Sequence, residues 1–126
     1  MFVARRRELV ECYDTLLKPL FPNVRPLARN QNGESSWHLY VVHIDFQTLG
    51  IERSEVMRLL AEHGIGSQVH YLPVHRQPYY EKRYGNLDFT GANQYYDTCL
   101  SLPLYPTMLN DDVAHVVNSL TSIILN

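Results

Sequence analysis

The sequence has 126 residues, of which 45% are hydrophobic and 19% are charged, and its formal net charge is −2. These values are typical of one globular domain, and they exclude a strongly basic nucleic-acid-binding protein. No apolar run approaches the roughly 20 residues that a membrane span needs, and the Arg-rich N-terminus is unlike a signal peptide. The two cysteines, Cys12 and Cys99, are too few for a disulfide framework, so we expect buried free thiols and a cytoplasmic protein.

The first part of the chain predicts a helix, a connection and a strand. Apolar residues at steps of three and four predict a helix over residues 2–18, which Pro19 ends. Residues 22–36 are rich in Pro, Asn and Gly and predict a connection, with one short extended piece around Val24. Residues 37–46 alternate between two largely apolar faces, so we expect a central strand that is covered on both sides.

The second part predicts short strands between helices. Ser54 is a suitable N-cap for a helix that Gly64 ends, and residues 67–71 are then expected to run as a strand until Pro73. This order resembles a βαβ unit, but the pattern leaves open whether the strands pair parallel or antiparallel. The remaining expected elements are helices over 78–84 and 89–99, an edge strand over 99–102, and a final helix with Asn110 as its cap.

Two histidine pairs have spacings that mimic metal sites, and both are rejected. His38 and His43 lie five positions apart in the expected strand, so their side chains point to opposite faces. His70 and His75 have the spacing of zinc-finger histidines, but no cysteine pair precedes them and Pro73 lies between them. The sequence also lacks the motifs of serine hydrolases and of glycine-rich phosphate-binding loops.

Most of the unusual chemistry lies in one stretch, GIGSQVHYLPVHRQPYY at residues 64–80. It gathers imidazole, phenol, carboxamide and guanidinium groups around two prolines. A polar, aromatic loop that is stiffened by proline and follows a strand is a typical place for a binding site. The alternative is a surface loop whose aromatic rings pack only on their own domain.

Three motifs resemble the C-terminal domain of the DegT/DnrJ/StrS family of pyridoxal-phosphate-dependent nucleotide-sugar aminotransferases. They are SWHLYVV at residues 36–42, GIGSQVHYLPVH at residues 64–75 and SLPLYP at residues 101–106. The resemblance covers nearly the whole chain. HYLPVH followed by QPYY is especially similar to the PseC branch, which aminates a UDP-linked 4-keto-6-deoxy sugar on the way to pseudaminic acid.

The resemblance implies an α+β fold, the small C-terminal domain of a fold-type-I aminotransferase, in which helices cover a short three-stranded sheet. Residues 1–20 would form the helix that leads into this domain. It also implies that the loop faces the active-site cleft and helps to hold a nucleotide sugar. The imidazole and phenol groups of the loop can donate hydrogen bonds to the phosphate and hydroxyl oxygens of such a substrate. The residues expected to contact the substrate are His70, Tyr71, His75, Gln77 and Tyr80.

Lysine is scarce, and this bears on the cofactor. Lys18 and Lys82 are the only lysines, and both are flanked by polar or turn residues at helix ends. A lysine that forms a Schiff base needs a desolvated or charge-tuned pocket, which neither position offers. The resemblance implies that pyridoxal phosphate and its lysine belong to a large domain preceding Met1. We therefore expect no cofactor, metal or catalytic residue in this chain, and activity only in the full-length enzyme, a homodimer that uses glutamate as amino donor.

Two alternatives stay open on the residues alone. The first is a stand-alone module that recognises a sugar or a nucleotide through its many tyrosines, and it requires that the chain alone bind a nucleotide sugar. The second is an interaction domain without a ligand, and it requires an apolar face that drives dimerisation.

Overall fold

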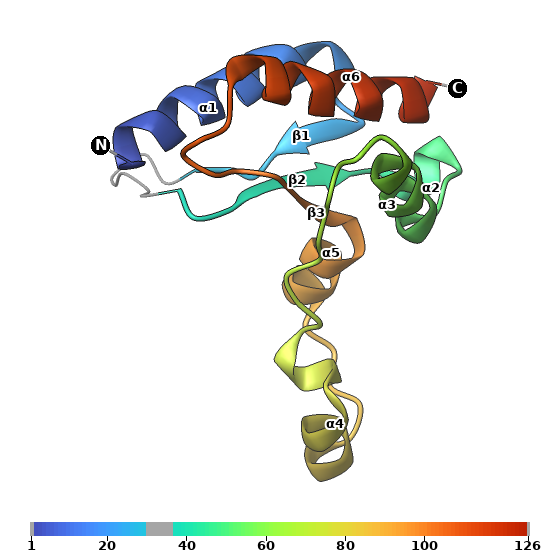
Figure 1. The fold of residues 1–126 in the computed structure, drawn as a ribbon. Coiled ribbons are helices and arrows are strands. Elements are labelled where there is room, and N and C mark those ends of the chain that lie inside the picture. Colours follow the sequence, from blue (N-terminus) through green and yellow to red (C-terminus); the bar gives the residue numbers. More distant parts are fainter. Residues whose placement is uncertain (1, 30–36, 126) are drawn as a thin grey trace.

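The computed structural model describes residues 2–29 and 37–125, which form a body and a projecting arm (Figure 1). The body is a three-stranded sheet with two long helices over one face, and the arm is residues 70–98. The elements of the body are α1 (Phe2–Leu17), the 3-10 helix η1 (Lys18–Leu20), β1 (Val24–Pro26), β2 (Tyr40–Ile44), α2 (Phe46–Leu49), α3 (Arg53–Glu62), β3 (Cys99–Leu102) and α6 (Asn110–Leu125). The elements of the arm are η2 (Val74–Arg76), α4 (Pro78–Tyr84) and α5 (Thr90–Thr98).

The sheet has the order β1-β2-β3, and β2 pairs antiparallel with both neighbours. Val24 lies opposite Ile44, and Val42 lies opposite Leu100. Because side chains alternate along a strand, these four residues share one face of the sheet, and all four are buried in the core. The prediction of a central strand is confirmed, and the strand direction that the sequence left open is antiparallel throughout the sheet.

Two stacked tyrosines join the helices to the sheet. The rings of Tyr13 on α1 and Tyr40 on β2 lie 4.4 Å apart, and both residues are fully buried. The Tyr13 hydroxyl donates to the Pro103 carbonyl oxygen at 2.6 Å, and the Tyr40 hydroxyl donates to Asp14 at 2.7 Å. Asp14 also accepts two hydrogen bonds of 2.7 Å from Arg29. Each buried phenol therefore has an acceptor, so the polar atoms add no unpaired group to the core.

The expected strand at residues 67–71 is wrong. Of these residues only Gln68 pairs with the sheet, through a single antiparallel bridge to Ser101. The third strand is β1 instead, which confirms the short extended piece expected around Val24. The central strand begins at Tyr40 and ends at Ile44, and its early end has a clear cause: Asp45 accepts a hydrogen bond from the Thr48 amide and so caps α2. The sequence therefore predicted the number of strands and the edge position of β3, but not all the segments that pair.

Both expected helix caps are also displaced by one or two positions. Helix α3 begins at Arg53, so Ser54 lies inside its first turn, and the preceding Glu52 makes no side-chain capping bond. Asn110 is the first residue of α6, and Asp112 closes that end by accepting a hydrogen bond from the Leu109 amide at 2.8 Å.

The longest helices, α1 and α6, have 16 residues each. Within the described residues, no helix is both long and apolar enough to cross a bilayer. Both cysteines are free thiols; Cys99 is buried at the start of β3, whereas Cys12 is only half-buried.

Candidate functional site

Two histidines tie the base of the arm to the sheet. His70 places Nδ1 at 2.8 Å from the hydroxyl oxygen of Ser101 on β3. His43 on β2 places Nδ1 at 2.7 Å from the hydroxyl oxygen of Thr98, at the end of α5. The Thr98 hydroxyl donates to the Gln94 carbonyl oxygen, so its own oxygen accepts the Nδ1–H of His43. Both segments that enter and leave the arm are therefore bonded to the sheet.

A third connection joins the arm to α3. The guanidinium groups of Arg53 and Arg76 lie 4.6 and 5.0 Å from the centre of the Tyr96 ring. Arg53 also donates to the carbonyl oxygens of Tyr96 and Cys99, at the C-terminal end of α5. Cations stabilise this end of a helix because its carbonyl groups carry partial negative charge. The direction of the arm is thus set by contacts from β2, β3 and α3.

The connection at His43 predicts how stability depends on pH. Burial, with the nearby positive charge of Arg25, lowers the pKa of His43 below its ordinary value. The unfolded chain therefore binds more protons in mildly acidic solution, and stability decreases as the pH falls through the interval between the two pKa values. We expect the free energy of unfolding in urea to decrease from about pH 7 to about pH 5, and to decrease less in His43→Gln.

Arg25→Gln tests the cause of this pH dependence. Since burial is the larger cause, this variant is expected to keep most of the decrease in stability. Equal pH slopes in His43→Gln and the unchanged protein would contradict the assignment to His43.

The five predicted contact residues do not all lie together. His70 is at the base of the arm, and the exposed Tyr71 ring packs edge-on against it at 4.6 Å. His75 and Tyr80 lie further along the arm, where both line the same groove. Gln77 donates from its side-chain amide to a carbonyl oxygen of the loop itself at 3.3 Å. The structure thus separates a basal pair from a distal pair and gives Gln77 a role within the loop.

The groove has a volume of about 450 Å³ and is almost wholly apolar. It combines the prolyl loop with α4 and with the segment that returns to α5. Leu87, Phe89 and Ala92 in this returning segment were not singled out in the sequence, because no local pattern there indicates a binding site. The groove is lined by Pro73, Val74, His75, Tyr80, Tyr84, Leu87, Phe89 and Ala92.

A short chain of hydrogen-bonded polar side chains begins at His75 in the lining of the groove. His75 is only 9% exposed, and its Nε2 lies 3.1 Å from Oδ1 of Asn93 on α5. Nδ2 of Asn93 donates to Oδ1 of Asp88 at 2.8 Å. The His75 ring packs edge-on against Phe89, with ring centres 4.9 Å apart. His75 is therefore held on one side by a polar partner and on another by an aromatic ring.

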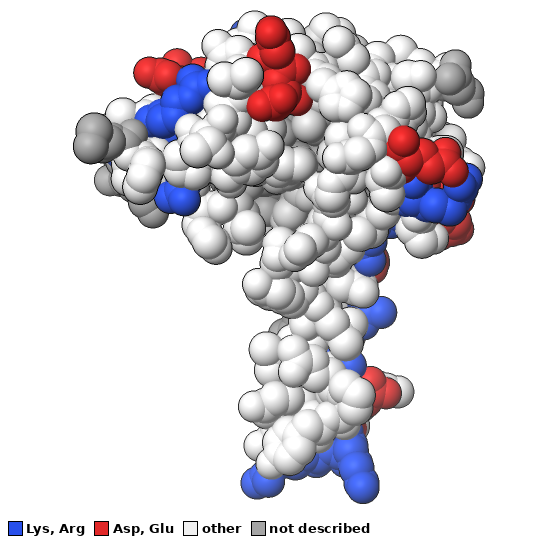
Figure 2. Space-filling view, in the orientation of Figure 1, with Lys and Arg blue, Asp and Glu red and all other residues white. Residues whose placement is uncertain are grey.

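The arm also exposes an unusual share of apolar surface. Of the fifteen large hydrophobic side chains exposed among the described residues, eight lie between Tyr71 and Phe89. Figure 2 shows that much of this face of the arm carries no charged residue, whereas Lys and Arg gather at its far end. Extended apolar surface of this kind is typical of a contact with another protein surface or a ligand.

The comparisons with known proteins concern the family and the fold. The sequence profile of the DegT/DnrJ/EryC1/StrS aminotransferase family matches residues 1–121. The chain belongs to this family. It is 40% identical to the spore coat polysaccharide biosynthesis protein SpsC of Bacillus subtilis over 123 residues, which are 95% of this chain and 31% of that protein.

Solved aminotransferases of the family have the same fold. Helicobacter pylori PseC, an aminotransferase involved in the biosynthesis of pseudoaminic acid, superposes on 98% of this chain with a TM-score of 0.87 and 23% identity. DesI, solved in the presence of its TDP-sugar product, superposes on 98% with a TM-score of 0.85 and 24% identity. The matches span 33% and 31% of those two chains, so this chain is about a third of their length. The expected α+β fold, with a three-stranded sheet covered by helices, is confirmed.

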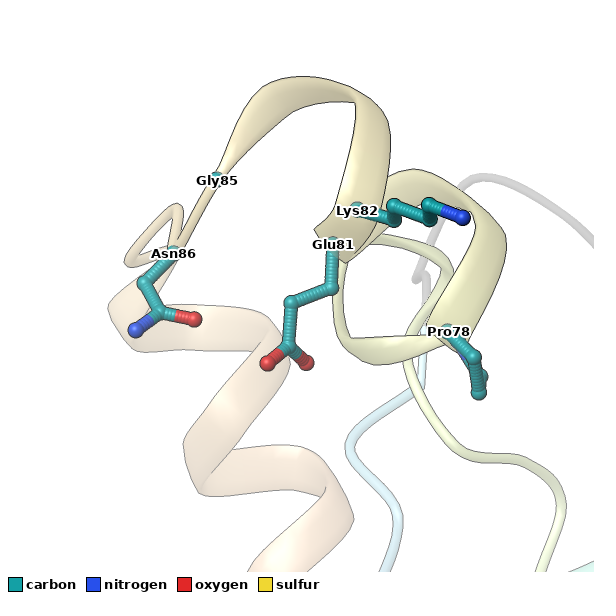
Figure 3. Close-up of a pocket in the computed structure, with 5 residues that line it drawn as sticks. All are labelled: Pro78, Glu81, Lys82, Gly85 and Asn86. Carbon is teal, nitrogen blue, oxygen red and sulfur yellow. The ribbon is translucent and has the colours of Figure 1, made fainter.

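The lysines of the chain do not fit the cofactor of this family. Lys18 and Lys82 are both exposed. Lys82 borders a shallow hollow of about 480 Å³ at the far end of the arm, with Pro78, Glu81, Gly85 and Asn86 (Figure 3). In Figure 3 the Glu81 and Asn86 side chains point the same way, and the Lys82 side chain extends away from them. All five lining residues are exposed and none is aromatic, so the hollow offers neither burial nor a ring that could pack on a pyridine.

A metal centre has no support in the part of the chain that the structure describes. There, no three His, Cys, Asp or Glu side chains are grouped so that they could hold a metal ion. The candidate site therefore consists of hydrogen-bonding and apolar groups.

Proposed function

We propose that this chain is the C-terminal small domain of a pyridoxal-phosphate-dependent sugar aminotransferase, with residues 1–20 as the helix leading into it. The full-length enzyme would transfer an amino group from glutamate to a nucleotide-linked 4-keto-6-deoxy sugar, with a UDP-linked sugar as the expected substrate, in the biosynthesis of a surface polysaccharide or glycan. The family match over residues 1–121 carries this proposal. The role of SpsC in spore coat polysaccharide biosynthesis and the TDP-sugar product of DesI support the substrate class.

In this proposal the chain supplies the substrate side of the cleft. His70 uses Nδ1 to bond Ser101, so Nε2 is the nitrogen left to meet a ligand. Tyr71 is 71% exposed beside it and can donate from its hydroxyl. Pyridoxal phosphate, bound mainly by the rest of the protein, supplies the electron sink for the transfer. The residues of this chain bind and orient the nucleotide sugar, and the apolar arm excludes water from it.

We also propose a cytoplasmic homodimer. The exposed apolar side chains between Tyr71 and Phe89 support a protein contact along the arm. They would be covered by the large domain, by the second subunit or by both.

The direct test is an aminotransferase assay of the full-length protein. With glutamate and a UDP-linked 4-keto-6-deoxy sugar, we expect formation of 2-oxoglutarate and an amino sugar. The 126-residue chain alone is expected to show no turnover and no pyridoxal phosphate absorbance. Turnover by this chain alone would contradict the proposal, and so would a full-length protein that leaves nucleotide-linked keto sugars unchanged. Saturable binding of nucleotide sugar to the isolated chain without an upstream domain in the gene would favour a binding module.

A further inference from the structure

The hydrogen bonds that link Asp88, Asn93 and His75 can run in only one direction from donor to acceptor. A carboxylate accepts hydrogen bonds and cannot donate them, so the atom of Asn93 that lies 2.8 Å from Asp88 must be its amide nitrogen. The amide oxygen of Asn93 is thereby turned toward His75, where it lies 3.1 Å from Nε2. An amide oxygen only accepts, so Nε2 of His75 must carry the hydrogen. Asp88 therefore sets which nitrogen of the nearly buried His75 ring carries the hydrogen. It does so indirectly, by fixing the orientation of the Asn93 amide.

We propose that Asn93 and Asp88 are positioning residues that hold His75 in the Nε2–H tautomer, so that its Nδ1 offers a lone pair to the bound substrate. This rests on the proposed function, in which His75 contacts a nucleotide sugar. In this tautomer Nδ1 carries no hydrogen, so it can accept from a hydroxyl group but cannot donate to a phosphate oxygen. The substrate group received at His75 is therefore a sugar or ribose hydroxyl. This departs from the expectation that both imidazoles of the loop donate hydrogen bonds.

The surroundings of His75 favour a single tautomer. The ring is only 9% exposed, packs edge-on against Phe89 and forms part of the largely apolar lining of the groove. A hydrogen bond is stronger, and a missing one more costly, where water is largely excluded. Within the described residues, no hydrogen bond reaches Nδ1, whereas His70 uses its own Nδ1 to bond Ser101. The two histidines of the loop therefore present different nitrogens, Nδ1 from His75 and Nε2 from His70.

The tautomer can be measured without any substrate. In the full-length protein labelled with ¹⁵N-histidine, we expect a protonated-type signal for Nε2 of His75 and an unprotonated-type signal for Nδ1. The signals are assigned by their loss in His75→Gln. Asn93→Leu is expected to abolish this preference. The double variant Asn93→Asp with Asp88→Asn is expected to restore it, because the carboxylate at position 93 accepts both from Nε2 and from the amide at position 88.

Two results of this measurement would overturn the proposal. One is a protonated Nδ1 in the unchanged protein, and the other is an unchanged tautomer in Asn93→Leu. Because no substrate is present, either failure is distinguishable from a failure of the proposed aminotransferase activity. If Asn93→Leu does not fold, the tautomer of the unchanged protein still tests the proposal, because a protonated Nδ1 there would overturn it.

Kinetics then test the role of the tautomer in binding. In the active enzyme, Asn93→Leu is expected to raise the KM for the nucleotide sugar about tenfold, the effect of one hydrogen bond, with kcat within about twofold. The double variant should recover the KM, and Gln94→Leu on the same helix should leave it unchanged. A KM that is unchanged in Asn93→Leu, or not recovered by the double variant, would overturn the positioning role.

Inhibition by inorganic pyrophosphate separates a hydroxyl contact from a phosphate contact. If His75 receives a hydroxyl group, the inhibition constant of pyrophosphate should be the same in Asn93→Leu and in the unchanged enzyme. A weaker inhibition in Asn93→Leu would assign the contact to phosphate and overturn the hydroxyl assignment.

Discussion

Replacing His70 by alanine in the full-length protein is expected to raise the KM for the nucleotide sugar by about ten- to a hundredfold. This corresponds to the loss of one hydrogen bond to a charged or strongly polar group, about 1.5–3 kcal/mol. The imidazole is already oriented by Ser101 at 2.8 Å, so its free nitrogen needs little further ordering when the substrate binds. The large domain is expected to hold the cofactor, so pyridoxal phosphate content and kcat should stay within about twofold.

Two variants serve as controls for His70→Ala. Ser101→Ala keeps the imidazole but removes its orienting partner, so we expect a smaller rise in KM, about threefold. His63→Ala removes an exposed imidazole at the end of α3, outside the arm, and should leave the KM unchanged. Initial rates over a range of nucleotide-sugar concentrations provide the measurement. A His70→Ala enzyme with an unchanged KM would remove this residue from the proposed site.

Replacing Leu100 by alanine is expected to lower the free energy of unfolding by about 2–5 kcal/mol. Leu100 is fully buried and lies opposite Val42 on the core face of the sheet, so truncation leaves a cavity beneath the helices. Such a loss is a large part of the total stability of a domain, about 5–15 kcal/mol. It would also disturb the neighbouring Ser101, whose hydroxyl lies on the opposite face and contacts His70.

Urea unfolding of the full-length protein, followed by a probe in this domain, measures the effect. Leu109→Ala is the matched control, because the same atoms are removed from a side chain that is 63% exposed. We expect it to change stability by no more than about 0.5 kcal/mol. A loss below about 1 kcal/mol for Leu100→Ala would contradict the position of this residue in the core.

The elements with a long periodic pattern could be predicted from the sequence. The final helix was predicted, and five of its apolar residues are buried in α6: Val113, Val116, Val117, Leu120 and Ile124. The central strand was also predicted, and its residues Tyr40 and Val42 are buried in the core. A pattern of this length indicates burial, because apolar residues that recur with the period of a helix or strand lie together on the same face.

The third strand could not be assigned in this way. Val24–Pro26 is three residues long, which is too short to show the alternation of a strand. Residues 67–71, by contrast, have the length of a strand and are bounded by turn-forming residues. Whether a segment pairs as a strand depends on which other strand lies beside it in the folded chain. Here β1 returns directly from η1 to lie beside β2, and the later segment leaves the sheet after one bridge at Gln68 to form the arm.

The family, the α+β class and the stretch that holds the candidate contact residues could be predicted from the sequence, because these depend on residue identity and local spacing. The hydrogen-bond partners of each residue became known from the folded chain. Gln77 forms a hydrogen bond within the loop. His70 forms one with Ser101, 31 residues away, and His75 forms one with Asn93, 18 residues away. Hydrogen-bond partners across such distances are set by how the arm folds back on itself, and no local pattern encodes them.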